Sequence, residues 1–452
     1  MNDMRRLSDE KLVEQQLKRL RKGTAGASKR KAGGDPKTEI EAGTAFAKQR
    51  GGRYLYDLRT RAWREFHEDG DWRPVEGDIR EDLLNTAGGE LRRSHSVAAA
   101  LTRASWRMER RHWDAEDGIA WPGGWHERET GQNHTVPSRD LHATCLAAAP
   151  ADHVDARWAD YVTHFLGRAA GGTLAKRKHL ARWLQAWAYS AFTAQGQIFE
   201  RFLFLQGRPG GGKSTFTESL RIAFGGHARV LSGERAAGYQ QAHREWMAQL
   251  DGKRLAVVEE LPDKGAAWKS AELNALVSGE GIQANFMRRN SFEVRFRGGL
   301  IVTGNTKPRA APDSGIFRRM ALLEVPAVPA EERDPEFKAS MLDLARDGVV
   351  TRWILEGRRA FLENVLRTLP PCMEAAVTDY RDEQDVFQQW IADCCEVGRD
   401  CEERASVLLQ SYVDYTGSKL SPRTFGQRLK EARFRPFKST GGRRHWSGLR
   451  VA

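Results

Sequence analysis

One nine-residue segment constrains the fold more than any other part of this chain. The segment GRPGGGKST, residues 207–215, follows the short apolar run FLFL and leads into the helical pattern TFTESLRIAF. This is the pattern G-x-x-x-x-G-K-[ST] between a strand and a helix, the setting that a phosphate-binding loop requires. Glycines let successive backbone N–H groups converge on phosphate oxygens, and the helix N-terminus adds partial positive charge. The segment therefore predicts a nucleotide-binding α/β domain.

The chemistry of such a loop assigns a role to its polar side chains. Lys213 is expected to reach the β- and γ-phosphates of ATP, and Ser214 to hold Mg²⁺. ATP and Mg²⁺ are the cofactors that the sequence predicts. The expected ATP-binding residues are Gly207, Arg208, Pro209, Gly210, Gly211, Gly212, Lys213, Ser214 and Thr215.

A second strand should supply acidic groups to the phosphates. The segment RLAVVEE, residues 254–260, has four apolar residues that end in two carboxylates, as a buried parallel strand with acids at its carboxyl end would. Glu259 is expected to bind Mg²⁺ through water, and Glu260 to act as general base on the attacking water. The alternative interpretation is a pair of exposed acids at a strand end.

Two further segments complete the predicted catalytic set. The apolar strand GLIVTGN, residues 299–305, ends in Asn305, which could order the same water or touch the γ-phosphate. Arg318 and Arg319 come directly before another apolar strand, at a place where a guanidinium could reach a γ-phosphate held by a neighbouring subunit. A solvated surface pair is the alternative for these two arginines.

The pattern along the chain predicts five regions. Residues 1–50 are expected to form a basic helix and a flexible linker, and 51–113 a β-hairpin with helices, because RYLYD and AWREFH alternate around a turn. Helical stripes at 155–169 and 174–192 predict an all-helical collar domain over 114–196. Apolar strands alternate with helices through an ATPase domain, 197–370, which predicts a mostly parallel sheet.

The last region, 371–452, is expected to bind DNA as a basic winged-helix domain. Residues 416–452 hold ten Lys or Arg and one acid, which is +9 of the chain's net charge of +12. A helix starting near Pro422 and a two-stranded wing turning at Gly441–Gly442 would place a recognition helix in a groove and the wing on the backbone. The expected DNA contacts here are Arg423, Arg428, Lys430, Arg443 and Arg444.

The composition of the chain limits its possible partners, its possible metal and disulfide sites, and its cellular location. A net charge of +12 favours a polyanionic partner, with nucleic acid first. The five cysteines and twelve histidines show no zinc-ligand or disulfide spacing. No apolar run approaches the length of a membrane span, and the N-terminus lacks the apolar centre of a signal peptide. We expect no membrane contact and a cytoplasmic protein, in the bacterial host if a phage encodes it.

The order of these motifs resembles superfamily 3 helicases, and within them the phage and plasmid primase–helicase family that includes the poxvirus primase–helicase. The resemblance rests on five segments and extends with lower specificity to about three quarters of the chain. The segments are GRPGGGKST (207–215), VVEELP (257–262), LNALVSGEGIQANFMRRNSFEVRF (273–296), LIVTGNTKPR (300–309) and DSGIFRRMALLEVP (313–326).

This resemblance implies a hexameric ring of AAA+ subunits that hydrolyses ATP and moves along single-stranded DNA, usually 3′ to 5′, in phage or plasmid replication. Single-stranded and forked DNA are the implied partners, with a separate primase or origin-binding protein as another. The resemblance also implies that residues 282–297 form a hairpin lining the pore. Its basic turn, with Arg288 and Arg289, would grip phosphates; a solubilising surface hairpin is the alternative.

The chain departs from the family pattern in two respects. Asn274 stands where relatives often have lysine, and Glu280 takes the acidic place in the following turn. About 110 residues precede the helical region, with no paired-acid site, so primer synthesis is not expected. Two other classes of function stay open: a replication initiator or origin-binding protein whose nucleotide site is only a switch, and an RNA-directed motor of the same superfamily.

Overall fold

The computed structural model describes most of the chain as two units. The described residues are 36–58, 62–86, 94–105, 107–110, 118–141, 143–232, 247–259, 261, 268, 270–285, 291–310, 315–417, 420–438 and 442–452. One unit comprises Met1–Phe66 with Arg73–Arg111, and the other His67–Trp72 with His112–Ala452. The predicted helix at 8–22 lies outside the described residues, as does the linker predicted at 23–37 except for Pro36 and Lys37, which begin a helix.

The first unit packs helices on a small sheet with strand order β3-β2-β1-β4. The predicted hairpin is confirmed, since β1 and β2 pair antiparallel with Tyr54 opposite Glu65. Helix α2 was not predicted, because its apolar positions are few; Phe46 is fully buried on it. The elements are α2 (Pro36–Arg50), β1 (Tyr54–Asp57), β2 (Ala62–Phe66), β3 (Trp72–Pro74), α3 (Ile79–Thr86), α4 (Ser94–Ser105) and β4 (Glu109–Arg110).

The second unit is built on a five-stranded sheet in which every neighbouring pair is parallel, as predicted for an α/β domain. The strand order is β14-β8-β13-β10-β9. The strand that precedes the phosphate loop, β8, is therefore separated from the acidic strand β10 by β13 alone. The strands are β8 (Phe202–Gln206), β9 (Ala228–Ser232), β10 (Leu255–Glu259), β13 (Gly299–Gly304) and β14 (Met320–Glu324).

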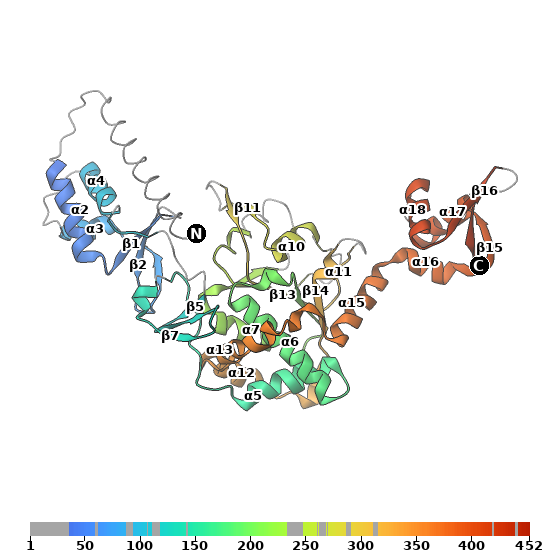
Figure 1. The fold of residues 1–452 in the computed structure, drawn as a ribbon, viewed down its shortest axis with the longest axis horizontal. Helices are drawn as coiled ribbons and strands as arrows, with labels where there is room; N and C mark the ends of the chain where they lie inside the picture. The colour runs from blue at the N-terminus through green and yellow to red at the C-terminus, as the bar shows by residue number, and fades with distance from the viewer. Residues whose placement is uncertain are drawn as a thin grey trace, which may run out of the picture. The chain divides into compact units, whose positions relative to one another are not determined.

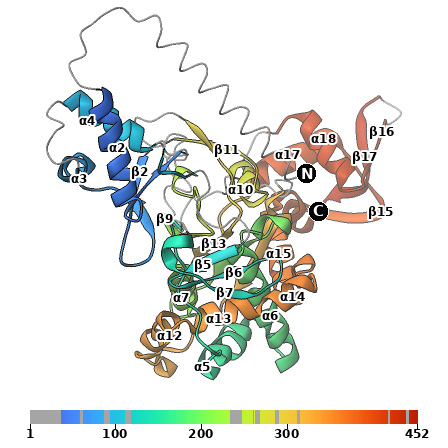
Figure 2. The ribbon, with the colours of Figure 1, turned by 60° about the vertical axis from the view of Figure 1, so that its left-hand side comes forward.

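Helices cover both faces of this sheet, because alternate side chains of each strand point to opposite faces. Leu203 and Leu205 pack with α6, α7, α12 and α13, whereas Phe202 and Phe204 pack with α10, α11, α15 and a hairpin. In both views α6, α7, α12 and α13 lie on one side of β13, and α10 and β11 on the other (Figures 1 and 2). The elements are α6 (Leu174–Phe192), α7 (Lys213–Phe224), α10 (Ser270–Val277), β11 (Ile282–Ala284), β12 (Phe292–Val294), α11 (Ile316–Arg319), α12 (Phe337–Arg346), α13 (Val349–Glu356), α14 (Arg358–Leu362) and α15 (Pro371–Gln384).

The prediction of an all-helical region over 114–196 is wrong in its first part. Strands β5 (Gly118–Trp121), β6 (Gly124–Glu127) and β7 (Asn133–Thr135) form an antiparallel sheet. The segment WPGGW is the turn between β5 and β6: Pro122 suits its first central position, and Gly123, at φ +84°, supplies the left-handed second one.

The helical part of this region follows the prediction. Asp155 caps α5 (Ala156–Asp160), whose chain continues through a π-helical turn, η2 (Tyr161–Phe165), and a 3₁₀ turn, η3 (Leu166–Ala170). Helix α6 begins and ends at the predicted residues. No helix within the described ranges is both long enough and apolar enough to cross a membrane.

The last part of the chain has a core of its own, but its first helix does not belong to it. Pro371 is the first residue of α15, where proline is tolerated, and Ala376 and Tyr380 pack into the core of the large sheet. The structure therefore places the boundary after Gln384 and not at 370. The remaining elements are α16 (Val386–Cys394), β15 (Cys395–Arg404), α17 (Ala405–Thr416), α18 (Pro422–Glu431), β16 (Arg435–Lys438) and β17 (Arg444–Val451).

These elements pack around the fully buried Trp390. The predicted pairing of the last two strands is confirmed, with Lys438 opposite Arg444. The sheet order is β15-β17-β16, so a third strand joins the pair. Strand β15 was not predicted, because its sequence, CEVGRDCEER, is largely charged and its residues are exposed or half-buried.

Candidate nucleotide-binding site

The sheet brings three of the four predicted segments to one edge, whereas Arg318 and Arg319 precede β14 and lie at the opposite edge. Because β8, β13, β10 and β14 run parallel, their carboxyl ends meet at the same edge of the sheet, where ligands of open α/β sheets bind. The phosphate loop follows β8, Asn305 follows β13, and Glu259 is the last residue of β10. A hydrogen bond from Gly207 N to Gly304 O, 3.1 Å, joins the first two.

The phosphate loop has the backbone conformation that its glycines were expected to allow. Gly210 and Gly212 have φ of +89° and +83°, a region that residues with a Cβ rarely adopt, and Gly212 is the N-cap of α7. Lys213 turns back over the loop and donates to the backbone oxygens of Gly207 and Arg208, the latter at 3.0 Å. Burial lowers the pKa of Lys213. Its ammonium is thus held at the loop by two carbonyls that a phosphate could replace.

Side chains from the helical region hold the loop from outside. Tyr161 donates its hydroxyl to Gly212 O at 2.9 Å, and burial raises the Tyr161 pKa well above its usual value, which keeps the donor protonated. The ring of Phe165 covers Gly212 so closely that an added Cβ would lie 2.4 Å from it. The guanidinium of Arg168 lies over the same ring, 4.4 Å from its centroid. The shape of the loop depends on residues about 50 positions upstream.

Glu259 faces the helix that carries the predicted metal ligand. Its side chain lies on the face of the sheet that α7 covers, and its Oε1 is 3.4 Å from Nη1 of Arg221, on α7. Ser214 is exposed in the first turn of the same helix, whereas Thr215 is buried. One hydroxyl and one carboxylate fit Mg²⁺, which keeps several waters and takes its other ligands from phosphate oxygens. Glu260, the predicted general base, lies outside the described residues.

The segment after β13 is tied to its neighbours. Gln206 donates from Nε2 to the backbone oxygen of Asn305 at 2.7 Å, and the Asn305 side chain is exposed. Two residues on, Lys307 lies 2.9 Å from Glu324 and 3.1 Å from Glu383 of α15. Burial alone would lower the Lys307 pKa, but these two carboxylates outweigh it and raise it. The segment is thereby linked to both β14 and α15.

The two predicted finger arginines have different surroundings. Arg319 is 12% exposed and its Nη2 lies 2.8 Å from Glu200, whereas Arg318 is 73% exposed and 4.0 Å from the same carboxylate. Arg201 donates to the backbone oxygen of Arg318 at 2.6 Å, which fixes the turn that carries both. Within this chain, Arg319 is braced and Arg318 projects outward.

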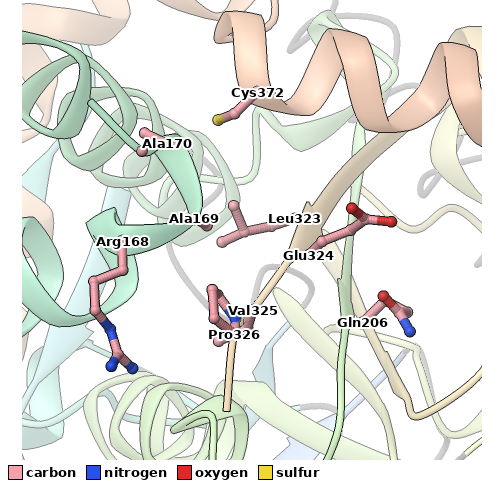
Figure 3. A pocket seen from close by; sticks show the side chains of 10 residues that line it. Arg168, Ala169, Ala170, Gln206, Leu323, Glu324, Val325, Pro326 and Cys372 are labelled. Atoms are coloured by element: carbon pink, nitrogen blue, oxygen red, sulfur yellow. The ribbon is translucent and has the colours of Figure 1, made fainter. Parts of the chain in front are cut away.

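A cavity of about 530 Å³ adjoins the phosphate loop at the β14 side (Figure 3). Arg168, Gln206, Glu324 and Cys372 contribute polar groups to its wall, together with backbone from η3 and the segment after β14. Val325, which also lines the cavity, packs directly against the loop, since a Cβ added at Gly207 would lie 2.3 Å from its oxygen. The cavity therefore lies next to the loop, with Val325 between them, although no loop residue lines it.

The two predicted DNA-binding regions are described in part. Strands β11 and β12 pair antiparallel, as predicted for the hairpin, but its tip with Arg288 and Arg289 lies outside the described residues. In the last part of the chain, α18 and the β16–β17 pair enclose a groove of about 980 Å³. Its lining includes Arg423, Lys430, Lys438 and Arg444.

Two of the predicted contacts of this region lie elsewhere. Arg428 is on a different side of α18, 5.9 Å from the centroid of the Phe387 ring, and is not among the residues that line the groove. Arg443 is exposed next to β17 and is likewise not part of the lining. Lys438 lines the groove and was not predicted.

Sequence reasoning missed several residues at this site. Tyr161 and Phe165 were expected only as core residues of a helix, since nothing in the sequence relates them to a loop 50 residues away. Arg221 lies two helical turns after Lys213 on α7, so helical spacing could have predicted that both side chains lie on the same face of the helix. Arg333 contacts the loop at Gly210 from the polar segment EERDPE, which carries no motif.

Comparisons with known proteins show a likeness of fold. A family model described as a family of unknown function (DUF5906) matches residues 205–319, and no curated protein matches the chain. Among solved structures, the fold is similar to an apo structure of the NrS-1 C-terminal region (305–718), with a TM-score of 0.57 and 11% identity over 92% of this chain and all of that one. An A form of the same region gives a TM-score of 0.53 over 88% and 96% of the two chains. At this identity the likeness shows the fold alone.

Proposed function

We propose that this protein is an ATP-hydrolysing motor that acts on DNA during replication, as a superfamily 3 helicase does. The observation that carries the proposal is the convergence at one sheet edge of the phosphate loop, the Glu259 carboxylate and Asn305. Phosphoryl transfer needs positioned charge more than covalent chemistry. A lysine, a hydroxyl and carboxylate for Mg²⁺, and a polar residue beside them form such a set.

Each residue has one task in this proposal. Lys213 leaves its two backbone carbonyls and meets the β- and γ-phosphates, while the N-terminus of α7 contributes partial positive charge. Ser214 and Glu259 hold Mg²⁺, which would neutralise charge on the phosphate oxygens. Glu260 accepts a proton from the attacking water, and Asn305 orients that water.

The adenosine end of ATP fits the cavity beside the loop. Val325, in the wall of the cavity, packs on Gly207 and Gly211 at the β14 side of β8, and the strand that brings Glu259 lies on the other side of β8. Arg168, Gln206 and Glu324 offer donors and acceptors for a base or ribose. Replacing Ala170 in its wall with tryptophan should block ATP binding while inorganic tripolyphosphate still binds.

We assign the trans-acting finger to Arg318 in a hexameric ring. An arginine that completes the site of a neighbouring subunit must extend from its own surface, and Arg318 is the exposed member of the pair. Arg319, held by Glu200, braces the turn. Neither a monomer nor a ring of subunits without Arg318 should hydrolyse ATP well.

DNA contacts are proposed at two places. Arg288 and Arg289, at the turn of the β11–β12 hairpin, would hold the phosphates of single-stranded DNA in the pore. In the last part of the chain, the order helix, strand, helix, helix, strand, strand supports the winged-helix interpretation. Arg423, Lys430, Lys438 and Arg444 would then line a duplex-binding groove.

The test is ATP turnover and strand displacement on forked DNA with a 3′ or a 5′ tail. Lys213→Ala should lose ATP binding and turnover, whereas Glu260→Gln should still bind ATP but lose hydrolysis, because it keeps the shape and loses the base. Arg359→Gln, an 88% exposed position on α14, is the control. ATP binding without turnover in the unchanged protein would favour a nucleotide switch, and stimulation by RNA in place of DNA would favour an RNA-directed motor.

The hairpin assignment has its own test. Arg288→Ala with Arg289→Ala should leave basal ATPase nearly unchanged and abolish stimulation by single-stranded DNA. The slope of log affinity against log salt should fall by about 0.7 for each phosphate that the variant no longer neutralises. Unwinding by the double variant at the normal rate would place the DNA path elsewhere.

A further inference from the structure

We propose that Arg333, from the same subunit, contacts the phosphate chain of the bound nucleotide; this rests on the proposed ATP site. Arg333 lies between η6 (Ala330–Glu332) and α12, far along the chain from the phosphate loop. A Cβ built on Gly210 would lie 2.5 Å from Cζ and 2.5 Å from Nη2 of Arg333. The guanidinium therefore lies directly against the backbone of the loop.

Two hydrogen bonds hold this guanidinium in place. The Nε of Arg333 donates to the backbone oxygen of Val328 at 2.9 Å, and Val328 N donates to the oxygen of Gly210 at 3.2 Å. Val325, earlier in the same segment, packs on Gly207 and Gly211. The segment that carries Arg333 is thus attached to the loop along its length.

The charge of Arg333 has no acidic neighbour within the described ranges. No carboxylate there lies within 4.0 Å of its guanidinium, although Glu331, Glu332 and Asp334 are close in sequence. Donation from Nε uses one of the five N–H groups of arginine, which leaves four on Nη1 and Nη2. The side chain is exposed at the same surface as Gly210. An exposed planar cation with that many donors matches phosphate oxygens.

A structural brace is the competing explanation, since Nε donates to the oxygen of Val328, whose own N–H is bonded to the loop at Gly210. A brace would use the packing of the side chain and its Nε, whereas a phosphate contact would use the charge and the Nη groups. The Arg333 guanidinium at Gly210 also adds a second cation beside Lys213, where a nucleotide brings several negative charges. The contribution of the Arg333 charge can be separated from that of its packing by substitutions that keep or remove the charge, and by a ligand that has phosphates alone.

The experiment measures binding of a fluorescent ATP analogue and its displacement by inorganic tripolyphosphate, which has phosphates but no base or ribose. Arg333→Gln should weaken both by about 10- to 100-fold, the range of a charge-assisted hydrogen bond. Arg333→Lys should recover part of that loss, because it keeps the charge. Arg359→Gln serves as the matched control.

Three results would overturn the assignment: unchanged affinity of Arg333→Gln for the ATP analogue, a loss for the analogue without a loss for tripolyphosphate, or equal losses in the Gln and Lys variants. Lys213→Ala separates this inference from the proposed function. If Lys213→Ala binds nucleotide normally, the ATP site itself is wrong; if it fails while Arg333→Gln binds normally, only the role of Arg333 is wrong.

Discussion

Arg318 and Arg319 should respond in opposite ways to substitution by alanine. The two side chains are adjacent in sequence, yet one is 73% exposed and the other 12% exposed against Glu200. Arg319→Ala removes the partner of Glu200, whose side chain is 42% exposed, together with buried side-chain packing. A surface pair contributes about 0–1 kcal/mol and loss of one partner of a buried pair costs about 3–5, so a half-buried pair should cost about 1–3 kcal/mol.

Arg318→Ala should leave the fold unchanged and slow hydrolysis. An exposed substitution changes stability by about 0.5 kcal/mol or less. Loss of an arginine finger slows phosphoryl transfer by about 10³- to 10⁵-fold, which is roughly 4–7 kcal/mol in the barrier. Thermal melting and ATPase rate with single-stranded DNA present therefore separate the two: Arg319→Ala melts lower, and Arg318→Ala melts normally but is inactive.

Mixing subunits tests whether the active site is shared. Arg318→Ala subunits lack a finger and Lys213→Ala subunits lack a working phosphate loop, so a mixture should recover some ATPase where an intact loop meets an intact finger. Glu200→Gln is a useful control, because it removes the charge 2.8 Å from Arg319 and only the longer, 4.0 Å contact of the exposed Arg318. Full activity of Arg318→Ala, or an inactive Arg319→Ala that melts at the normal temperature, would refute the assignment, as would no recovery at any mixing ratio.

Three other positions give further predictions. Gly212→Ala places a Cβ 2.4 Å from Phe165 at a φ of +83°, which costs about 1–3 kcal/mol of strain. The variant should not bind nucleotide in a titration, while far-ultraviolet circular dichroism checks that it is folded. Normal nucleotide binding would disprove the role of Phe165. Burial lowers the pKa of His126, on β6, so the folded state favours the neutral imidazole and stability should fall as the pH drops below about 6.5. The melting temperature of His126→Gln should therefore depend less on pH between 7.5 and 5.5. An unchanged pH dependence would show that His126 is not its source. Lys307→Met removes contacts to Glu324 and Glu383, both about half exposed, and should cost about 1–2 kcal/mol and speed hydrogen exchange in α15; unchanged exchange would contradict the link.

The strands and the phosphate loop could be predicted because their signals are local. FLFL, LAVVE and GLIVTG are runs of apolar residues that end in polar or glycine residues, and all three are buried strands in the structure. The glycines of the loop indicate its backbone conformation, because glycine adopts positive φ angles that other residues rarely adopt. Because strands that alternate with helices are usually parallel, the sequence also predicted that the polar residues after these strands lie at one edge of the sheet.

The supports of the site could not be predicted, because they depend on distant contacts. Tyr161 reads as one position of an apolar stripe, and only the fold brings its hydroxyl to Gly212. Arg333 belongs to a polar segment that resembles any solvated loop. The difference between Arg318 and Arg319 likewise depends on Glu200, more than a hundred residues upstream.

The contacts of Tyr161 and Phe165 with Gly212 also determine which fragments of the chain can form the phosphate loop. A fragment beginning at 197, where the first strand of the ATPase region was expected, would keep every motif residue yet lack the hydroxyl and the ring that hold the loop. It would also lose α6, whose Trp183 and Trp187 are buried in the same core as β8 and α7. The smallest fragment that keeps this core should therefore begin before β5, which contributes Ile119 and Trp121 to it, and end after Gln384, the last residue of α15. In the full chain, the loop should reach its final shape only after residues 155–192 have docked.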